Sequence, residues 1–326
     1  MYKLADDFVA GHAESESLRE AFGKSLVAAA KQDDRIVALS ADLAQSVGFG
    51  DFRDQMGDRF IEVGVAEQNL IGVASGLAAM GKIPFAGSYA AFSPGRNWEQ
   101  IRTMVCLNDQ PVKIVSSHTG LNVGADGATH QMLEDIALMT ALPNMVVLAP
   151  GDALEAAKFA KLMAEDGQPN YIRLPRASLP VYSTIDDDLE IGKAYLVRQD
   201  DDAIVTIVST GSMTSSALYA SGKLMISGIP CEVVHVPTIK PLDKGTILDS
   251  ASRTKVTVTV EEHQVTGGLG SIVASTILES DTRPQKFKRL GVYDDFGESG
   301  SAVELWHKYQ LDVEGIVNQI KRLLDS

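Results

Sequence analysis

One carboxylate of the sequence enters a strongly apolar segment, where it could take part in acid-base chemistry. Glu67 lies in the run 63–69, and the apolar run 70–74 follows it directly. A carboxylate at the start of such a helix would be partly desolvated, which would let it share a proton with the nitrogen of a heterocyclic ring. The alternative is that Glu67 occupies an exposed first helical turn, where the helix dipole favours acidic side chains. This segment alone leaves both interpretations open.

Two aromatic residues could form a flat wall against a planar ring. Tyr89 and Phe92 are three positions apart in the segment 89–100, and small residues separate them. Aromatic side chains favour offset stacking on planar rings. Ordinary packing in a hydrophobic core is the alternative use of such a pair, and the pattern alone does not exclude it.

A glycine-rich loop with two histidines and an aspartate is the third candidate. His118, Asp126 and His130 lie in the segment 117–131, which lacks the apolar periodicity of a core element. Loops held by a rigid scaffold often carry binding and catalytic groups. A metal site fits poorly, because no cysteine accompanies the loop and the two histidines do not share a helical face. The segment therefore predicts a functional loop that holds no metal.

The elements that would position these residues alternate between helical periods and short β-branched runs. In the first half of the chain, strands are predicted at 36–39, 83–87, 112–116, 145–148 and 171–174, and helices at 17–31, 67–80, 97–107 and 153–164. This order predicts an α/β fold with a mostly parallel sheet. The candidate segments lie at the ends of predicted strands, and open α/β sheets bind ligands at the carboxyl ends.

A second α/β series follows a polar, acidic interval at 183–188, which has the composition of a domain boundary. Its strands are predicted at 203–208, 231–236, 256–260 and 287–290, and its helices at 212–226, 268–278 and 313–324. We therefore predict two doubly wound domains, 1–185 and 186–326.

The composition narrows the class of protein. The chain of 326 residues has 45% hydrophobic and 22% charged residues, which is typical of a globular enzyme with two domains. Its net charge of −14 disfavours sequence-independent binding to nucleic acid or to an anionic membrane. Lys82 and Pro84 interrupt the longest apolar stretch, 71–92, so no transmembrane segment is expected. Two cysteines and a start without a signal-type apolar region predict a cytoplasmic protein.

Taken in order, the candidate segments resemble the transketolase family, and the resemblance covers nearly the whole chain. The segments that carry it in the first half are Gly64-Val65-Ala66-Glu67-Gln68, Tyr89 and Phe92 ahead of Glu99-Gln100-Ile101-Arg102, Gly124-Ala125-Asp126-Gly127-Ala128-Thr129-His130-Gln131, and Leu142-Pro143-Asn144-Met145. Those in the second half are Glu261-Glu262-His263 and Gly267-Gly268-Leu269-Gly270. The resemblance implies a pyrimidine-binding domain at 1–185 and a transketolase C-terminal domain at 186–326.

The resemblance implies roles for the residues around a thiamine diphosphate cofactor. Glu67 matches the glutamate that hydrogen-bonds a ring nitrogen of the cofactor's aminopyrimidine, and this bond leads to removal of the proton at the thiazolium C2. Phe92, with Tyr89 beside it, matches the aromatic wall around the pyrimidine. Asp42 matches an acidic position near the cofactor and the dimer interface.

On the substrate side, the resemblance implies contacts with sugars. His118 and His130 match catalytic-site histidines that contact the hydroxyls of the donor sugar, and Asp126 matches the aspartate that recognises the hydroxyl configuration of the acceptor. The groups that would bind substrate phosphate are Arg19, Ser46 and Arg176. Arginine suits this role because its planar guanidinium forms paired hydrogen bonds with phosphate. The implied reaction is the transfer of a two-carbon ketol unit between sugar phosphates.

The sequence departs from a full-length transketolase in ways that bear on its partners. The family holds Mg²⁺ (or Ca²⁺) and the cofactor's diphosphate with a Gly-Asp-Gly segment, and this chain contains none. We therefore expect a separate diphosphate-binding subunit, an α₂β₂ assembly in which this chain also self-associates, and no activity without the partner. The spacing between Phe92 and Arg96 is one residue longer than usual, and Ala128 stands where proline is common.

Three alternatives share part of the pattern. The β subunit of a 2-oxoacid dehydrogenase shares the motif at 64–68, but the loop 124–131 fits it poorly. Deoxyxylulose-phosphate synthase shares Gly-Ala-Asp-Gly at 124–127, whereas the continuation at 133–137 is closer to transketolase. A non-catalytic interaction module would have lost the acid-base and substrate positions, all of which are present.

Overall fold

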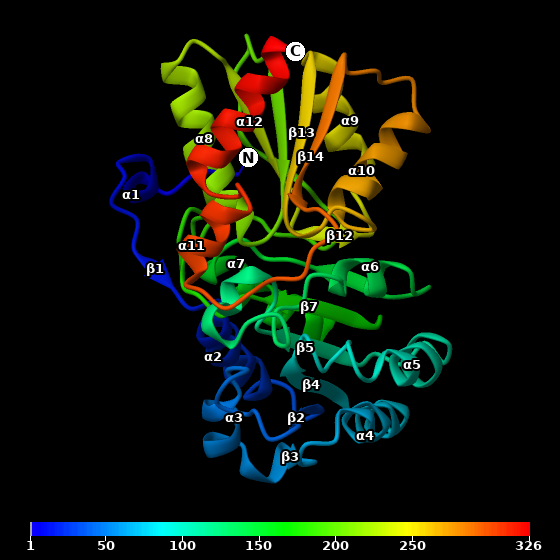
Figure 1. Ribbon diagram of the computed structural model, residues 1–326. Coiled ribbons are helices and arrows are strands. Elements are labelled where there is room, and N and C mark those ends of the chain that lie inside the picture. The colour runs from blue at the N-terminus through cyan, green and yellow to red at the C-terminus, as the bar shows by residue number, and fades with distance from the viewer. Residues whose placement is uncertain (1) are drawn as a thin grey trace.

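The computed structural model describes residues 2–326 (Figure 1). A seven-stranded sheet in the order β12-β6-β7-β5-β4-β2-β3 forms the centre of its first unit. Its strands are β2 (Ile36–Ser40), β3 (Phe60–Glu62), β4 (Ile83–Tyr89), β5 (Lys113–Ser117), β6 (Val146–Leu148), β7 (Asn170–Leu174) and β12 (Thr238–Lys240). All neighbouring strands are parallel except β12 and β6. The mostly parallel sheet predicted for this half is confirmed.

Helices cover both faces of this sheet because its strands are apolar on both sides. Ile36 and Ala38 of β2 pack into one hydrophobic cluster, and Val37 and Leu39 pack into another. Buried strands of this kind are typical of parallel sheets enclosed by helices. The first cluster includes α2 (Leu18–Ala30), α3 (Gly50–Gln55) and α7 (Ala153–Glu165), and the second includes α4 (Glu67–Ala79) and α6 (Asp135–Thr140).

The helix predicted at 97–107 differs in kind from the prediction. α5 (Trp98–Gln100) is a single turn, and a π-helix, η2 (Ile101–Cys106), continues it. π-Helical turns are rare and occur mostly as single turns that interrupt an α-helix. The predicted helical segment is therefore present, and most of it is π-helical rather than α-helical.

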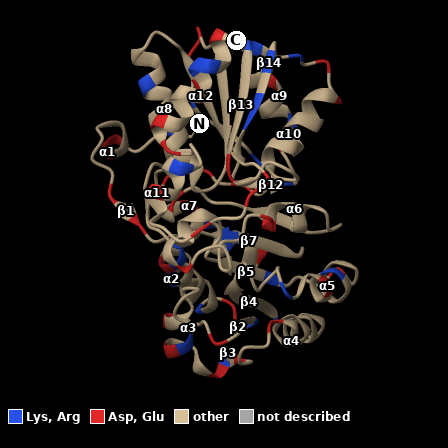
Figure 2. Cartoon of the chain, viewed as in Figure 1, with Lys and Arg blue, Asp and Glu red and all other residues tan. Residues whose placement is uncertain are grey.

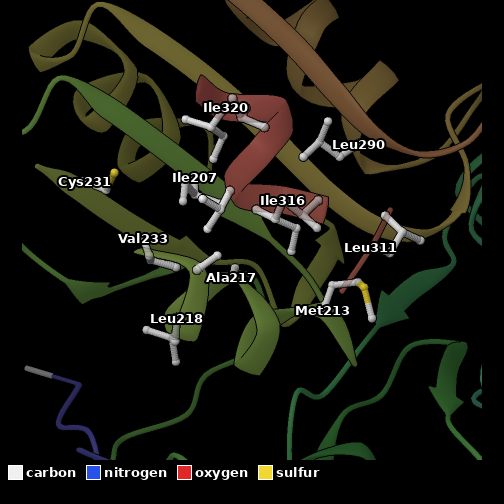
Figure 3. Close-up of a cluster of buried hydrophobic side chains, with 14 of the residues drawn as sticks. Ile207, Met213, Ala217, Leu218, Cys231, Val233, Leu290, Leu311, Ile316 and Ile320 are labelled. Carbon is white, nitrogen blue, oxygen red and sulfur yellow. The ribbon is translucent and has the colours of Figure 1, made fainter. Parts of the chain in front are cut away.

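The second sheet has five strands in the order β14-β13-β10-β11-β9, of which only β9 is antiparallel to its neighbour. Ile207 and Val233 face α8 and α12 in the cluster of Figure 3, whereas Val208 and Val234 face α9 and α10. The strands are β9 (Tyr195–Arg198), β10 (Val205–Ser209), β11 (Cys231–His235), β13 (Val256–Gln264) and β14 (Lys286–Val292), and the helices are α8 (Met213–Ile226), α9 (Lys244–Arg253), α10 (Leu269–Leu278) and α12 (Val313–Asp325). β9 and α9 are additions to the predicted elements.

Two short segments cross between the units built on these sheets. β12 belongs to the second half of the sequence, yet it pairs with β6 at the edge of the first sheet. Near the N-terminus, α1 (Asp6–Val9) places Phe8 in the hydrophobic cluster of the second sheet. β1 (Ser15–Glu16) and β8 (Leu179–Pro180) form a small antiparallel ladder, and the predicted domain limit at 185/186 lies after β8 in the sequence. The two units are therefore interlocked.

The remaining helices are short. α11 (Ala302–Lys308) begins with a capping box, in which Ser301 and Glu304 bond each other's backbone N–H groups. It packs against a 3₁₀ segment, η3 (Leu121–Asp126), in the predicted functional loop. A second 3₁₀ turn, η1 (Gly57–Arg59), precedes β3. No helix among residues 2–326 has the length and apolar character needed to cross a membrane.

Candidate active site

The predicted site residues gather where parallel strands of the first sheet end. Tyr89 is the last residue of β4, His118 directly follows β5, and Arg176 lies shortly after β7. The carboxyl ends of parallel strands meet at one edge, which is where open α/β sheets bind ligands. Glu67 at the start of α4 and Arg19 in the first turn of α2 complete this edge.

Glu67 is buried at the start of α4, with 2% of its surface exposed. Asn97 Nδ2 donates a hydrogen bond to its backbone carbonyl at 2.9 Å, and Arg96 Nη1 lies 3.7 Å from its carboxylate Oε2. Among residues 2–326, no group donates a hydrogen bond to the carboxylate itself. The exposed first turn is therefore the wrong alternative. A buried carboxylate without a donor can share a proton with a ligand.

The aromatic pair belongs to a cluster of four rings rather than to a hydrophobic core. Tyr89 and Phe92 are stacked at 6.1 Å between ring centroids, and Tyr89 stacks on His118 at 3.8 Å. His130 meets Phe92 edge-on at 5.5 Å. Because both Tyr89 and Phe92 are only half-buried, a planar ligand can still contact the cluster.

His118 is held in a demanding conformation. Its φ of 57° lies in the left-handed region, which a residue with a Cβ rarely occupies outside functional sites and turns. Ser117 Oγ lies 3.0 Å from its Nδ1. Burial, together with the nearby charges of Arg19 and Arg176, lowers the pKa of His118 to about 3. The ring is therefore neutral near pH 7 and can both donate and accept a hydrogen bond.

Two arginines meet beside this histidine. Arg19 Nη1 donates to the carbonyl of Ser46 at 2.6 Å, and its Nη2 donates to the carbonyl of Arg176 at 3.1 Å. Arg19 Nε is buried and has no partner among residues 2–326. Burial also lowers the pKa of Arg19 from its usual value. Since Arg176 lies 3.8 Å from Asp126, the structure brings Arg19, Arg176 and Asp126 together.

Asp42 stands apart from this group, whereas Ser46 joins it through a contact with Arg19. Asp42 is exposed after β2 with φ 60°, and its backbone N–H donates to Glu62 Oε1 at 2.7 Å. Ser46 contacts Arg19 through its backbone carbonyl rather than its hydroxyl. The described chain, 2–326, contains no group of three or more His, Cys, Asp or Glu residues placed to hold a metal ion.

Sequence analysis missed two residues that support this edge. Glu62 Oε1 also accepts from the backbone N–H of Gly64 at 2.9 Å, so it joins the loop after β2 to the segment before α4. Arg173 in β7 donates from Nε to Asp135 Oδ2 at 2.8 Å, and both side chains are buried. An arginine within an otherwise apolar strand signals a buried counter-ion, and that signal is visible in the sequence. Nothing in the sequence marks Glu62.

Comparison with known families supports the resemblance over both halves. Residues 14–181 match the transketolase pyrimidine-binding domain, and residues 192–316 match the transketolase C-terminal domain.

Relatives of similar length extend this match. A 6-deoxy-6-sulfo-D-fructose transketolase subunit from Clostridium sp. (strain MSTE9) is 42% identical over 305 residues, which cover 93% of each chain. An apulose-4-phosphate transketolase subunit from Phocaeicola vulgatus is 36% identical over 91% of this chain and 94% of that protein. A solved structure of a split gene transketolase, an inactive β4 tetramer, superposes with a TM-score of 0.87 at 41% identity, covering 95% of this chain and 98% of that one.

Proposed function

The chain belongs to the transketolase family, whose members depend on thiamine diphosphate, and we propose that it is the cofactor-activating subunit of a heteromeric transketolase. The proposed reaction transfers a two-carbon ketol unit from a ketose phosphate to an aldose phosphate. The observation that carries this proposal is the strand edge that holds buried Glu67, a wall of rings and two arginines.

The residues present fit the pyrimidine half of the cofactor. Thiamine diphosphate, when bound, supplies the carbanion chemistry of ketol transfer. Glu67 would hold a proton at the ring nitrogen, because its carboxylate is buried and accepts no hydrogen bond from residues 2–326. Phe92 and Tyr89 would bound the ring. The proposal assigns the diphosphate and Mg²⁺ (or Ca²⁺) to a partner subunit in an α₂β₂ assembly.

The same edge fits an anionic sugar. Neutral His118 and the neighbouring His130 would bond donor hydroxyls, and Asp126 would bond an acceptor hydroxyl. Arg19 Nε is a buried donor without a partner among residues 2–326, which a substrate oxygen would satisfy. The names of the two relatives above give one sulfonated and one phosphorylated sugar. Both groups present oxygens that paired arginines can bind.

The test is a ketol-transfer assay of the purified chain, alone and mixed with candidate diphosphate-binding subunits, in the presence of thiamine diphosphate and Mg²⁺. Transfer from xylulose phosphate to an aldose phosphate is expected only in the mixture. Robust transfer by the isolated chain would refute the two-subunit proposal. Condensation of pyruvate with glyceraldehyde phosphate would instead indicate deoxyxylulose-phosphate synthase chemistry. A sulfonated ketose as a second donor would define the preferred anion.

A further inference from the structure

A carboxylate of the second unit reaches into the substrate loop of the first. Glu262 lies near the carboxyl end of β13, is 1% exposed, and belongs to an acidic segment that faces the first unit (Figure 2). Its Oε1 accepts from the backbone N–H of Asn122 at 2.7 Å, and its Oε2 accepts from Asn122 Nδ2 at 3.0 Å. From its own side, Trp306 Nε1 at 2.8 Å and the hydroxyl of Ser212 also donate to it. These donors fix the carboxylate in one orientation.

Asn122 extends this contact to Arg176. Its Oδ1 accepts from the backbone N–H of Arg176 at 2.7 Å and from that of Ala177 at 3.3 Å. Arg176 Nη1 donates in turn to the carbonyl of Val123 at 2.6 Å. The hydrogen bonds from Glu262 through Asn122 therefore lead directly to an arginine of the proposed anion site. Networks of this kind hold their members in one arrangement when every group is satisfied.

Glycines allow the two units to approach this closely. A Cβ on Gly120 would lie 2.6 Å from Glu262 Cδ, and the φ of Gly120 is 77°. At the other end of the loop, a Cβ on Gly127 would lie 2.6 Å from Ser299 Oγ in the segment before α11. Figure 1 shows α11 beside this loop, and the two elements are in contact. The second unit therefore encloses the loop from both ends.

We propose that Glu262 is a positioning residue for substrate recognition, which acts through Asn122 to hold the loop 118–131 and Arg176 in the arrangement that binds the substrate's anionic group. This inference rests on the proposed function of that loop. Within residues 2–326, the hydrogen-bond partners of Glu262 do not include Glu67. Cofactor activation is therefore expected to be independent of Glu262.

The first test measures the loop in the chain itself. Glu262→Gln keeps the shape of the side chain, but an NH2 group replaces one carboxylate oxygen and would face one of the two Asn122 donors, so one acceptor for Asn122 is lost. Hydrogen exchange of the Asn122 amide and of the neighbouring loop amides is expected to accelerate about tenfold or more. Unchanged exchange in this variant would overturn the proposal.

Glu261→Gln is the matched control. Glu261 is the preceding residue of the same strand, and its carboxylate accepts from the backbone N–H groups of Leu269 and Gly270, within the second unit. Loop exchange in this variant is expected to equal that of the unmodified chain. Equal acceleration in both variants would show general loosening of the second unit and would also overturn the proposal.

The second test uses the reconstituted two-subunit enzyme. Glu262→Gln is expected to raise the KM for an anionic donor about tenfold, with a smaller effect on kcat and with unchanged affinity for thiamine diphosphate. Parallel loss of cofactor affinity would indicate a merely structural role. If the unmodified assembly transfers no ketol unit, the proposed function fails, whereas the exchange test still decides whether Glu262 positions the loop.

Trp306→Phe covers the case in which Glu262→Gln does not fold. The change removes a single donor to Glu262 and keeps most of the ring volume. Loop exchange and the donor KM are expected to change in the same direction as in Glu262→Gln, by about two- to threefold. No change in either quantity would count against a positioning role.

Discussion

Buried ionisable groups occur in two regions of the molecule, and the regions differ in how fully the polar atoms of these groups are hydrogen-bonded. At the seam between the units, which we define as Asp135, Arg173, Glu155, His235 and Glu262, the polar side chains are paired or hydrogen-bonded. Arg173 Nε lies 2.8 Å from Asp135 Oδ2, and His235 Nε2 lies 2.9 Å from Glu155 Oε2. The carboxylate of Glu262 accepts from donors of both units.

The strand edge of the first sheet is the opposite case. Among residues 2–326, Glu67 accepts no hydrogen bond, and Arg19 Nε has no acceptor. His118 keeps a left-handed backbone. Proteins satisfy almost all of their buried polar groups, and the exceptions concentrate where a ligand completes them. The seam therefore holds paired groups, whereas the edge keeps unpaired groups that a ligand would complete in the proposed function.

Glu67→Gln should give the largest effect and tests the functional side of this contrast. Ketol transfer by the reconstituted enzyme is expected to fall about 10²–10⁴-fold, because proton sharing with the ring nitrogen is lost. The free energy of unfolding is expected to change little, since no hydrogen bond to the carboxylate is removed. Steady-state kinetics and urea unfolding measure the two quantities. The exposed Glu165→Gln is the control, and normal activity in Glu67→Gln would contradict the assigned role.

Asp135→Asn tests the structural side. It removes the carboxylate that pairs directly with buried Arg173, so the free energy of unfolding is expected to fall by about 3–5 kcal/mol. Combining it with Arg173→Met is expected to recover part of the loss, because no unpaired charge then stays buried. Chemical denaturation of both variants measures this. If the single variant were as stable as the unmodified chain, the seam would not be the stabilising region that the contrast requires.

Arg19→Met should have a smaller effect, confined to anionic substrates. The KM for a phosphorylated donor is expected to rise about ten- to hundredfold, the value of one or two hydrogen bonds to a charged group. A donor without the phosphate should lose little. Arg53→Met, which removes an exposed arginine paired with Asp54, serves as the control. Equal loss with charged and uncharged donors would remove Arg19 from the anion site.

The smallest expected effect is a difference in how stability depends on pH. Burial lowers the pKa of His118 from 6.5 to about 3, so between these values the unfolded chain binds the extra proton and His118 makes the fold less stable as the pH falls. Burial raises the pKa of Glu261 from 4.5 to about 7, so the folded chain keeps a proton that the unfolded chain releases. Glu261 therefore makes the fold less stable as the pH rises through this range.

Two variants separate these opposite slopes. His118→Asn, which tolerates the left-handed backbone, is expected to remove the acid-side loss, and Glu261→Gln is expected to remove the loss toward neutral pH. Each slope should amount to about 1 kcal/mol or less per pH unit. Urea unfolding at about pH 5 and about pH 6.5 measures them. Slopes of the same sign in both variants would contradict the assignment.

Much of the first unit could be predicted from the sequence because its strands are continuous apolar runs. β2 and β4 need only local information, since both faces of each strand are covered. The pairing of β12 depends on β6, which lies far away in the sequence, and three residues carry too weak a pattern to reveal it. The π-helix η2 was not predicted either, because π-helical turns are rare and occur mostly as single turns within α-helical segments.

The candidate site likewise has residues that the sequence marks and contacts that it does not. Residue types and glycine spacing suffice to mark Glu67, the aromatic pair and the histidine loop. The backbone carbonyl of Glu67 is held by Asn97, and the carbonyl that holds Arg19 comes from Ser46 in another loop. Contacts of this kind arise from the tertiary fold, so neither Glu62 nor the link from Glu262 to Asn122 has a local signature.

The late position of β12 in the sequence also affects how the first sheet folds during synthesis. The first sheet is completed by residues 238–240, which are synthesised after all of its other strands. Synthesis proceeds at about 5–20 residues per second, so several seconds separate β7 from β12. Until then the edge of β6 has no partner, and a bare strand edge readily pairs with other chains. Lys240 Nζ, which donates to the carbonyl of Thr140 at 2.9 Å, then fastens the added strand. The nascent chain is therefore most prone to aggregation before residue 240 emerges, and a fragment ending near residue 185 would remain in that state.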